Sequence, residues 1–167
     1  MMERALERWR CGVKTHTYEA RVHWTTPDGE GTKGYKSYRR DHTINADGKH
    51  EILASSDPAF RGDASRYNPE VLLVASLSSC HMLWYLHLCS VSGIRVLDYR
   101  DAASGTMEES ADGSAQFVRA ELRPIVTIAR GNDRARALGL HHDAHRLCFI
   151  ARSVNFQVEV APEVAEA

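Results

Sequence analysis

The stretch from residue 69 to residue 91 limits the possible folds more than any other part of the chain. Asn68 can cap a helix, Pro69 suits the first helical position, and the acidic Glu70 interacts favourably with the helix macrodipole. Gly93 provides a stop signal at the other end. Apolar residues lie on nearly every face of this helix, so we expect it to be central and buried, with a second copy of itself as one candidate packing surface.

Polar side chains interrupt the same stretch, namely Ser76, Ser78, Ser79, His81 and His87. They argue against a membrane-spanning helix and favour a helix that is buried in protein. The first ten residues mix acidic and basic side chains and lack the apolar run of a secretory signal. We therefore expect a cytoplasmic protein without a membrane partner.

Strand-like alternation of apolar residues precedes and follows this helix. We expect three strands before it, at 14–24, 35–44 and 50–54, with an Asp47-Gly48 turn between the last two. After it we expect strands at 94–107 and 115–130, a helix from Asn132 to about His145, and a strand at 154–160. The order βββαββαβ lacks the regular alternation of strand and helix that marks a parallel sheet, and it predicts an α+β fold.

Length and charge narrow the classes of function. A chain of 167 residues and 18.7 kDa has the usual size of one domain. We expect a single domain over residues 1–167, with an N-terminal extension at 1–13 and a frayed tail at 162–167. The 21 Lys and Arg residues nearly balance the 22 Asp and Glu residues, which argues against a nucleic-acid partner.

The chain has four cysteines, Cys11, Cys80, Cys89 and Cys148. They are too few and too widely spaced for a disulfide scaffold, and none forms a C-x-x-C pair, so their interest lies in their reactivity. A cysteine that acts as a nucleophile must be a thiolate, because the protonated thiol is far less reactive. Cys80 lies too far inside its helix to benefit from the helix dipole, and it therefore needs a cation from elsewhere.

Arg40 is the candidate for that cation. Alternate residues of the expected strand at 35–44 share one face, and this face carries Tyr38, Arg40, His42 and Ile44. The apolar members of this set indicate that the face looks inward. An inward-facing Arg40 needs an anion, which Glu70 and the Cys80 thiolate together could supply.

Two strings resemble the OsmC/Ohr family of organic hydroperoxide reductases, and the resemblance extends over residues 35–156. In NPEVLLVASLSSCHMLWYLHLC, Glu70 is followed ten residues later by Cys80, and AHRLCFIARSVNF surrounds Cys148. The resemblance implies that Cys80 attacks the peroxide, that Cys148 resolves the sulfenic acid to a disulfide, and that an arginine and a glutamate activate Cys80. It also implies an intertwined homodimer with active sites at the subunit interface, and reduction by a dithiol, often a lipoyl group. No metal or organic cofactor is expected.

Carried over by position, the glutamate is Glu70, whereas the arginine is Arg40 or its neighbour Arg39, because a slip of one residue would exchange them. On an unbroken helix Glu70 and Cys80 would lie about 15 Å apart along the axis. We therefore expect that Arg40 bridges them, or that the helix bends between them at its serines. After Cys80 the chain reads His-Met-Leu-Trp, which departs from the small or Phe-led continuation of the best-studied branch and leaves the preferred substrate open.

For the other cysteines and for the histidines, a structural interpretation stands beside a functional one. We expect Cys89 to be a core residue and Cys11 an exposed or loosely ordered thiol. His141 and His145 have i, i+4 spacing, and with His142 and Cys148 nearby they raise a metal-site hypothesis. A solvated helix face explains these histidines without a metal, and that is the interpretation we favour.

Trp84 stands one helical turn after Cys80. It is expected either to pack in the core or to form an apolar wall for an organic hydroperoxide. The alternative to an enzyme is a non-catalytic dimer that binds a small hydrophobic ligand or senses oxidation. Multiple turnover of peroxide with a dithiol would separate the two, because a binding protein consumes at most a stoichiometric amount.

Overall fold

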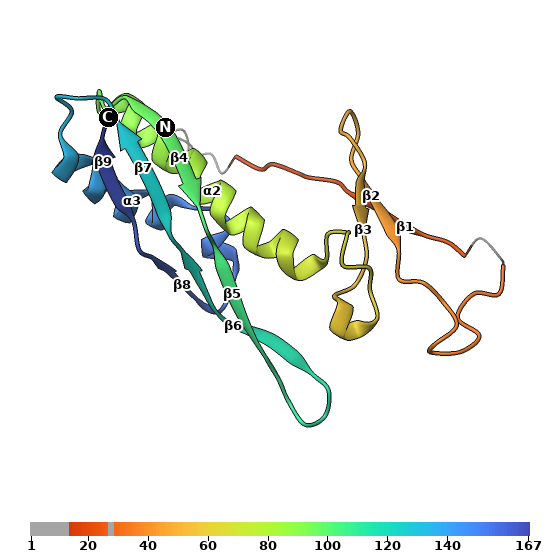
Figure 1. Ribbon diagram of the computed structural model, residues 1–167. Helices are drawn as coiled ribbons and strands as arrows, with labels where there is room; N and C mark the ends of the chain where they lie inside the picture. Colours follow the sequence, from red (N-terminus) through yellow and green to blue (C-terminus); the bar gives the residue numbers. More distant parts are fainter. Residues whose placement is uncertain (1–13, 27–28) are drawn as a thin grey trace, which may run out of the picture. The chain divides into compact units, whose positions relative to one another are not determined.

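The structure is a computed structural model that describes residues 14–26 and 29–167 (Figure 1). The chain divides into two compact units, Met1–Arg66 and Tyr67–Ala167. The single domain predicted from the sequence stays a prediction, and the expected N-terminal extension at 1–13 lies outside the described residues. Each unit is built differently.

The first unit contains an antiparallel meander of β1 (Arg21–Trp24), β2 (His42–Asn45) and β3 (Ile52–Ala54). The predicted Asp-Gly turn joins β2 to β3, with Gly48 at a φ of 69° that favours glycine. β2 is shorter than expected because a local turn precedes it: the Ser37 amide donates to the Gly34 carbonyl oxygen at 2.9 Å. A short 3-10 helix, η2 (Pro58–Phe60), lies in the loop that follows β3.

The second unit begins with α2 (Pro69–Val91), whose bounds match the prediction. The Asn68 side chain accepts a hydrogen bond from the Val71 amide at 2.7 Å, which satisfies one of the free amides of the first turn. Gly93 follows the helix at a φ of 73°.

α2 buries one stripe of residues spaced four apart, and the rest of its surface is half-buried or exposed. The stripe consists of Leu77, His81, Tyr85 and Cys89. By length and composition α2 could also cross a membrane, but this stripe packs against α3 and the strands of the same unit, as in a core helix. The burial that the sequence predicts on nearly every face is thus observed on this one stripe.

Six strands and a second helix complete the unit. One sheet has the order β4-β7-β9 and the other β5-β6-β8, and in each an antiparallel pair is extended by a parallel strand. The strands are β4 (Val96–Asp101), β5 (Ser104–Glu109), β6 (Ala115–Leu122), β7 (Pro124–Ile128), β8 (Gln157–Val160) and β9 (Glu163–Glu166). The helix is α3 (Arg134–Leu147), and η3 (Ala151–Ser153) follows it.

The α+β class is confirmed, but the predicted order of two strands between the helices is wrong. Each long strand that the sequence predicted is broken into two. At one break the Arg123 amide donates to the Asp101 carboxylate at 2.7 Å instead of to a neighbouring strand, and Pro124 has no amide to donate.

The expected frayed tail is also wrong. β9 pairs in parallel with β7, and the Ala161 amide before it donates to the Leu122 carbonyl oxygen at 2.9 Å. Val164 of β9 is only 4% exposed and belongs to the hydrophobic core. The C-terminal segment is thus an ordered strand of the sheet, and the Arg134 side chain also donates to the Val164 carbonyl oxygen at 2.6 Å.

The two helices pack on each other and cover one face of these strands (Figure 1). The main core lies between them and combines Tyr85, Cys89, Ile94, Val126, Ile128, Ala137, Leu140, Ala144 and Val164. A smaller cluster of Leu77, Ala120 and Leu122 lies further along α2. Cys80 and Cys148 lie at this helix–helix contact.

Candidate active site

Two cysteines meet where α2 and α3 pack together. Cys80 lies in the middle of α2, and Cys148 is the residue that ends α3. Their side chains interact, and neither forms a disulfide. The structure thus brings together the attacking and the resolving cysteine that the resemblance implied.

The two thiols have different surroundings. Cys80 is half-buried, whereas Cys148 is fully buried. Burial, together with the neighbouring Cys80, raises the pKa of the Cys148 thiol to about 11, and the hydrogen bond from the Ala151 amide to Sγ at 3.5 Å opposes this only in part. Cys148 is therefore a protonated thiol at neutral pH, and Cys80 is the one that a small molecule can reach.

The environment of the Glu70 side chain is unusual for the first turn of a helix. Its Oε2 atom is buried and has no hydrogen-bond partner among the described residues. α2 runs without interruption from Glu70 to Cys80, so the two residues lie about 15 Å apart along the helix axis. Glu70 does not contact the thiol directly, and its buried oxygen requires a donor that the described part of the chain does not supply.

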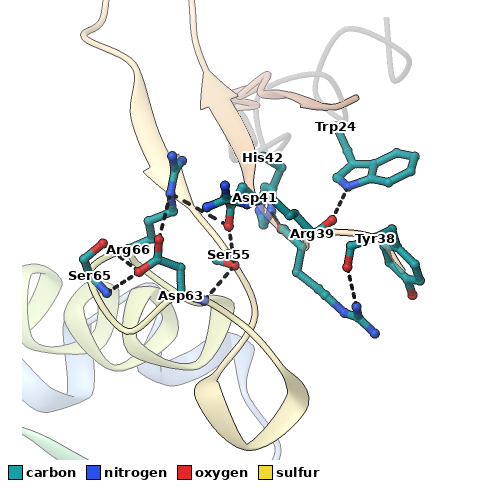
Figure 2. Close-up of polar contacts among 10 residues, drawn as sticks. Trp24, Tyr38, Arg39, Asp41, His42, Ser55, Asp63, Ser65 and Arg66 are labelled. Atoms are coloured by element: carbon teal, nitrogen blue, oxygen red, sulfur yellow. Dashed lines mark hydrogen bonds and ion pairs between the residues drawn. The ribbon is translucent and has the colours of Figure 1, made fainter. Parts of the chain in front are cut away.

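Arg39 and Arg40, the arginines expected to serve as that donor, lie in the first unit, where Arg39 belongs to a polar network (Figure 2). Arg39 forms an ion pair with Asp41 at 2.9 Å. Arg66 lies 3.9 Å from Asp41 and 3.7 Å from Asp63, and the Ser55 hydroxyl donates to Asp41 at 3.1 Å. The charges of Arg39 and Arg66 are thus compensated within their own unit. The sequence analysis did not consider Arg66 as a donor for Glu70, although Arg66 lies only four residues before it in the chain.

Arg40 has no carboxylate partner among the described residues. It donates to the carbonyl oxygens of Tyr38 at 2.6 Å and Tyr35 at 2.9 Å, and its guanidinium lies over the rings of both tyrosines. Although it precedes β2, it lines a cavity of about 310 Å³ together with Tyr38 and His42, the residues predicted to share its face. Because Arg40 and the thiols belong to different units, the choice between Arg39 and Arg40 stays a prediction.

Aromatic rings adjoin the cysteine pair. Trp84, one turn after Cys80 on α2, packs against the main core. Its ring meets the ring of Phe149, the residue after Cys148, edge to face at a centroid distance of 5.3 Å. Phe149 is itself 65% exposed. The expectation that Trp84 packs in the core is confirmed, and the expectation that it forms an apolar wall for a substrate stays a prediction.

The histidines of α3 do not all lie on a solvated face, as the sequence analysis had favoured. His142 is exposed, but His141 is buried, and its Nδ1 lies 3.0 Å from Nε2 of the buried His81 on α2. Among residues 14–26 and 29–167, no group of three or more potential ligands is arranged to hold a metal ion. The sequence reasoning treated His81 only as an interruption of an apolar helix, because its partner lies on another element.

The remaining cysteines are simpler. Cys89 is 1% exposed, adjoins Tyr85 and belongs to the main core, which confirms the expectation of a packing residue. Cys11 lies outside the described residues.

Comparison with known proteins agrees with the fold and with the sequence strings. The model of the OsmC-like protein family matches residues 62–163. A solved OsmC-like protein of unknown function from Vibrio cholerae is 32% identical, with a TM-score of 0.81, and the match covers 90% of this chain and 100% of that one. Among curated proteins, no relative with significant sequence similarity was found.

More distant solved structures share the fold. An organic hydroperoxide resistance protein from Legionella pneumophila is 18% identical, with a TM-score of 0.66 over 91% of this chain and 98% of that one. The organic hydroperoxide resistance protein OhrB of Bacillus subtilis is 19% identical, with a TM-score of 0.58 over 90% and 98%. Since the family model spans more than half of the chain and the Vibrio protein aligns along most of it, the chain belongs to the OsmC-like protein family.

Proposed function

We propose that this protein is a thiol peroxidase that reduces organic hydroperoxides to alcohols. The observation that carries the proposal is the contact between a half-buried cysteine, Cys80, and a fully buried one, Cys148. Solved proteins of the same fold that are named organic hydroperoxide resistance proteins support the substrate class.

The reaction has two steps on the protein. The Cys80 thiolate attacks a peroxide oxygen, the O–O bond breaks, and the alkoxide takes up a proton and leaves as an alcohol. Cys80 then holds a sulfenic acid, which the Cys148 thiol attacks to form a disulfide with release of water. The two thiols thereby supply the two electrons that reduce the peroxide. A dithiol, such as a lipoyl group, restores both thiols by exchange.

The surroundings of the thiols support this division of roles. The buried Cys148 is protonated at neutral pH and is shielded from peroxide, so it does not compete for the first step. Its contact with Cys80 means that it meets the sulfenic acid as soon as this forms. An isolated sulfenic acid would instead stay open to further oxidation.

For activation of Cys80 we favour Arg40 over Arg39. Arg39 is neutralised by Asp41, whereas Arg40 keeps an uncompensated charge within the described residues. The buried Oε2 of Glu70 has no donor in the described part of the chain, and an arginine that reaches both Glu70 and the thiolate would satisfy both anions.

The apolar surface beside the thiols supports organic substrates over hydrogen peroxide. Trp84 lies one helical turn after Cys80, Phe149 directly follows Cys148, and their rings, which contact each other, could offer aromatic surface to an alkyl or aryl group. Hydrogen peroxide has no apolar group and therefore gains no binding energy from such a surface.

We also propose that the protein is a homodimer in which the outward side of α2 packs on a second copy. That side carries exposed apolar residues, including Val71, Leu83 and Val91, which are 48%, 62% and 69% exposed. A helix that is apolar on nearly every face gains most from burial on both sides.

The dimer predicts an effect of charge on the outward side of α2. The wild type should have the mass of a dimer by light scattering at micromolar concentration, and Leu83→Glu should dissociate at least tenfold more readily, because it places a carboxylate in an apolar interface. Leu138→Glu, which alters an exposed leucine of α3, is the matched control and should stay dimeric. A monomeric wild type would contradict the proposed architecture.

Peroxide turnover tests the enzyme itself. With dihydrolipoamide as reductant, the wild type should consume many equivalents of cumene hydroperoxide and prefer it to hydrogen peroxide. Cys80→Ser should lose activity by at least about 100-fold, because no nucleophile remains, and Cys148→Ser should lose at least about tenfold and accumulate sulfenic acid. Cys89→Ala is the control and should keep its activity. Stoichiometric consumption by the wild type would instead support a binding or sensing protein.

Alkylation of Cys80 at pH 6 tests the arginine. Arg40→Met should slow the reaction of Cys80 with iodoacetamide by roughly tenfold, because removal of a nearby cation lowers the fraction of thiolate. Arg39→Met should change the rate less than twofold, since its charge is already paired with Asp41. An unchanged rate in Arg40→Met would rule out its role, and a loss confined to Arg39→Met would assign the role to that neighbour.

A further inference from the structure

A buried histidine pair joins the two helices that carry the reactive cysteines. His81 on α2 is 0% exposed and His141 on α3 is 2% exposed. The proposed chemistry makes no use of them, although His81 directly follows Cys80 in the chain. Burying two imidazoles is costly unless their polar atoms are satisfied, so the pair calls for an explanation.

The two rings meet edge to edge. Their planes differ by 9° and their centroids lie 5.3 Å apart, whereas His81 Nε2 and His141 Nδ1 are 3.0 Å apart. Because these nitrogens are much closer to each other than the centroids are, they face each other between the rings. One nitrogen donates a hydrogen and the other accepts it, so their lone pairs cannot converge on a metal ion.

Tyr85 holds His141 from a second side. It lies one turn after His81 on the same buried stripe of α2, and its ring stacks on the ring of His141 at a centroid distance of 3.8 Å. The outer nitrogens, His81 Nδ1 and His141 Nε2, have no hydrogen-bond partner among the described residues. The bond between the rings is therefore the one described hydrogen bond that fixes their orientation.

The position of this bond relates it to the cysteines. His141 and Cys148 are seven residues apart on α3, about two helical turns, and both side chains are buried. A contact that fixes His141 against α2 also fixes where the end of α3 lies along α2. A disulfide tolerates little error in this register, since its Cα atoms must come within about 4.4 to 6.8 Å.

We propose that the hydrogen bond between His81 and His141 is a positioning device that sets the register of α3 on α2, so that Cys148 meets Cys80. The inference rests on the proposed peroxidase function, because it concerns the step that closes the disulfide. His81 and His141 are positioning residues and contact neither the peroxide nor the sulfurs in this role. A hydrogen bond suits the role better than apolar packing, because rigid rings joined end to end allow less sliding.

The pair should also make the fold sensitive to acid. Burial, together with the neighbouring His145, lowers the pKa of His81 to about 4, and Asp101 opposes this shift. Burial, together with His81, lowers the pKa of His141 to about 3. The ordinary value is 6.5, so the unfolded chain binds more protons as the pH falls from about 6.5 to 4 and the folded state loses stability in that window.

Urea unfolding between pH 7 and pH 4.5 measures this loss. For each pH unit by which the pH falls, each buried histidine should raise the unfolding equilibrium constant by up to about tenfold. His141→Asn should remove one such contribution, whereas His142→Leu, which alters an exposed histidine, should unfold with the pH dependence of the wild type. Equal pH dependence in the wild type and His141→Asn would show that the pair is not held neutral.

The decisive experiment measures how readily Cys80 and Cys148 form a disulfide without any peroxide. Proteins carrying Cys11→Ser are equilibrated in glutathione buffers, quenched, and analysed for the Cys80–Cys148 disulfide by mass spectrometry. The matched variants are His141→Leu and His141→Asn, because the side chains of Leu and Asn have nearly the same shape. Only Asn keeps a polar atom near the position of Nδ1. We expect the equilibrium constant to fall at least tenfold in His141→Leu and to stay within about threefold of the wild type in His141→Asn and in the control His142→Leu.

A purely structural role would lower the stability of His141→Leu but leave the equilibrium constant of its folded state unchanged, and that result overturns the proposal. If His141→Leu does not fold, the double variant His81→Leu/His141→Leu leaves no unpaired nitrogen and is measured in its place, with the same expectation. A wild type that forms the disulfide in glutathione but shows no peroxide turnover would refute the peroxidase function and leave the positioning role standing. A wild type that forms no such disulfide would refute the positioning role.

Discussion

The contact between α2 and α3 is the constraint on which the rest of the site depends. α2 is apolar on nearly every face, and the stripe of Leu77, His81, Tyr85 and Cys89 gives it a defined side that packs in the core of the chain. Because Cys80 sits beside this stripe and Cys148 ends α3, the packing that stabilises the unit also brings the two thiols together. The same surface therefore stabilises the unit and holds the two thiols in contact.

The two sides of α2 have different tasks. The buried side packs against the second helix, while the outward side leaves the apolar side chains of Leu83 and Val91 exposed. Among the described residues, the buried oxygen of Glu70 has no donor and Arg40 has no carboxylate partner.

The sequence predicts some of this organisation because some signals are local. The bounds of α2 follow from Asn68, Pro69 and Gly93, each of which acts on its own turn of helix. Strand breaks such as the one at Arg123 depend on a side chain more than twenty residues away, Asp101, and alternation of apolar residues does not encode them. β9 was missed for a related reason, since Val164 is ordered by a partner strand and not by its neighbours in the sequence.

The candidate site was predictable only in part. The roles of Cys80 and Cys148 came from resemblance, because nothing in their spacing shows that a residue of one helix will meet the end of another. The histidines show the same limit: the i, i+4 spacing of His141 and His145 drew attention to a single helix, whereas the partner of His141 is His81, sixty residues earlier. Pairings across elements become visible only in three dimensions.

The central claim is that Cys80 and Cys148 form one redox unit that reduces a peroxide. It is tested most directly by adding one equivalent of cumene hydroperoxide to the reduced protein, without any reductant, and mapping the cysteines by peptide mass spectrometry while the alcohol product is quantified. The account predicts one alcohol per chain and a single disulfide between Cys80 and Cys148, with Cys89 still reduced. Recovery of unreacted peroxide and free thiols, or a disulfide that excludes Cys80, would contradict it.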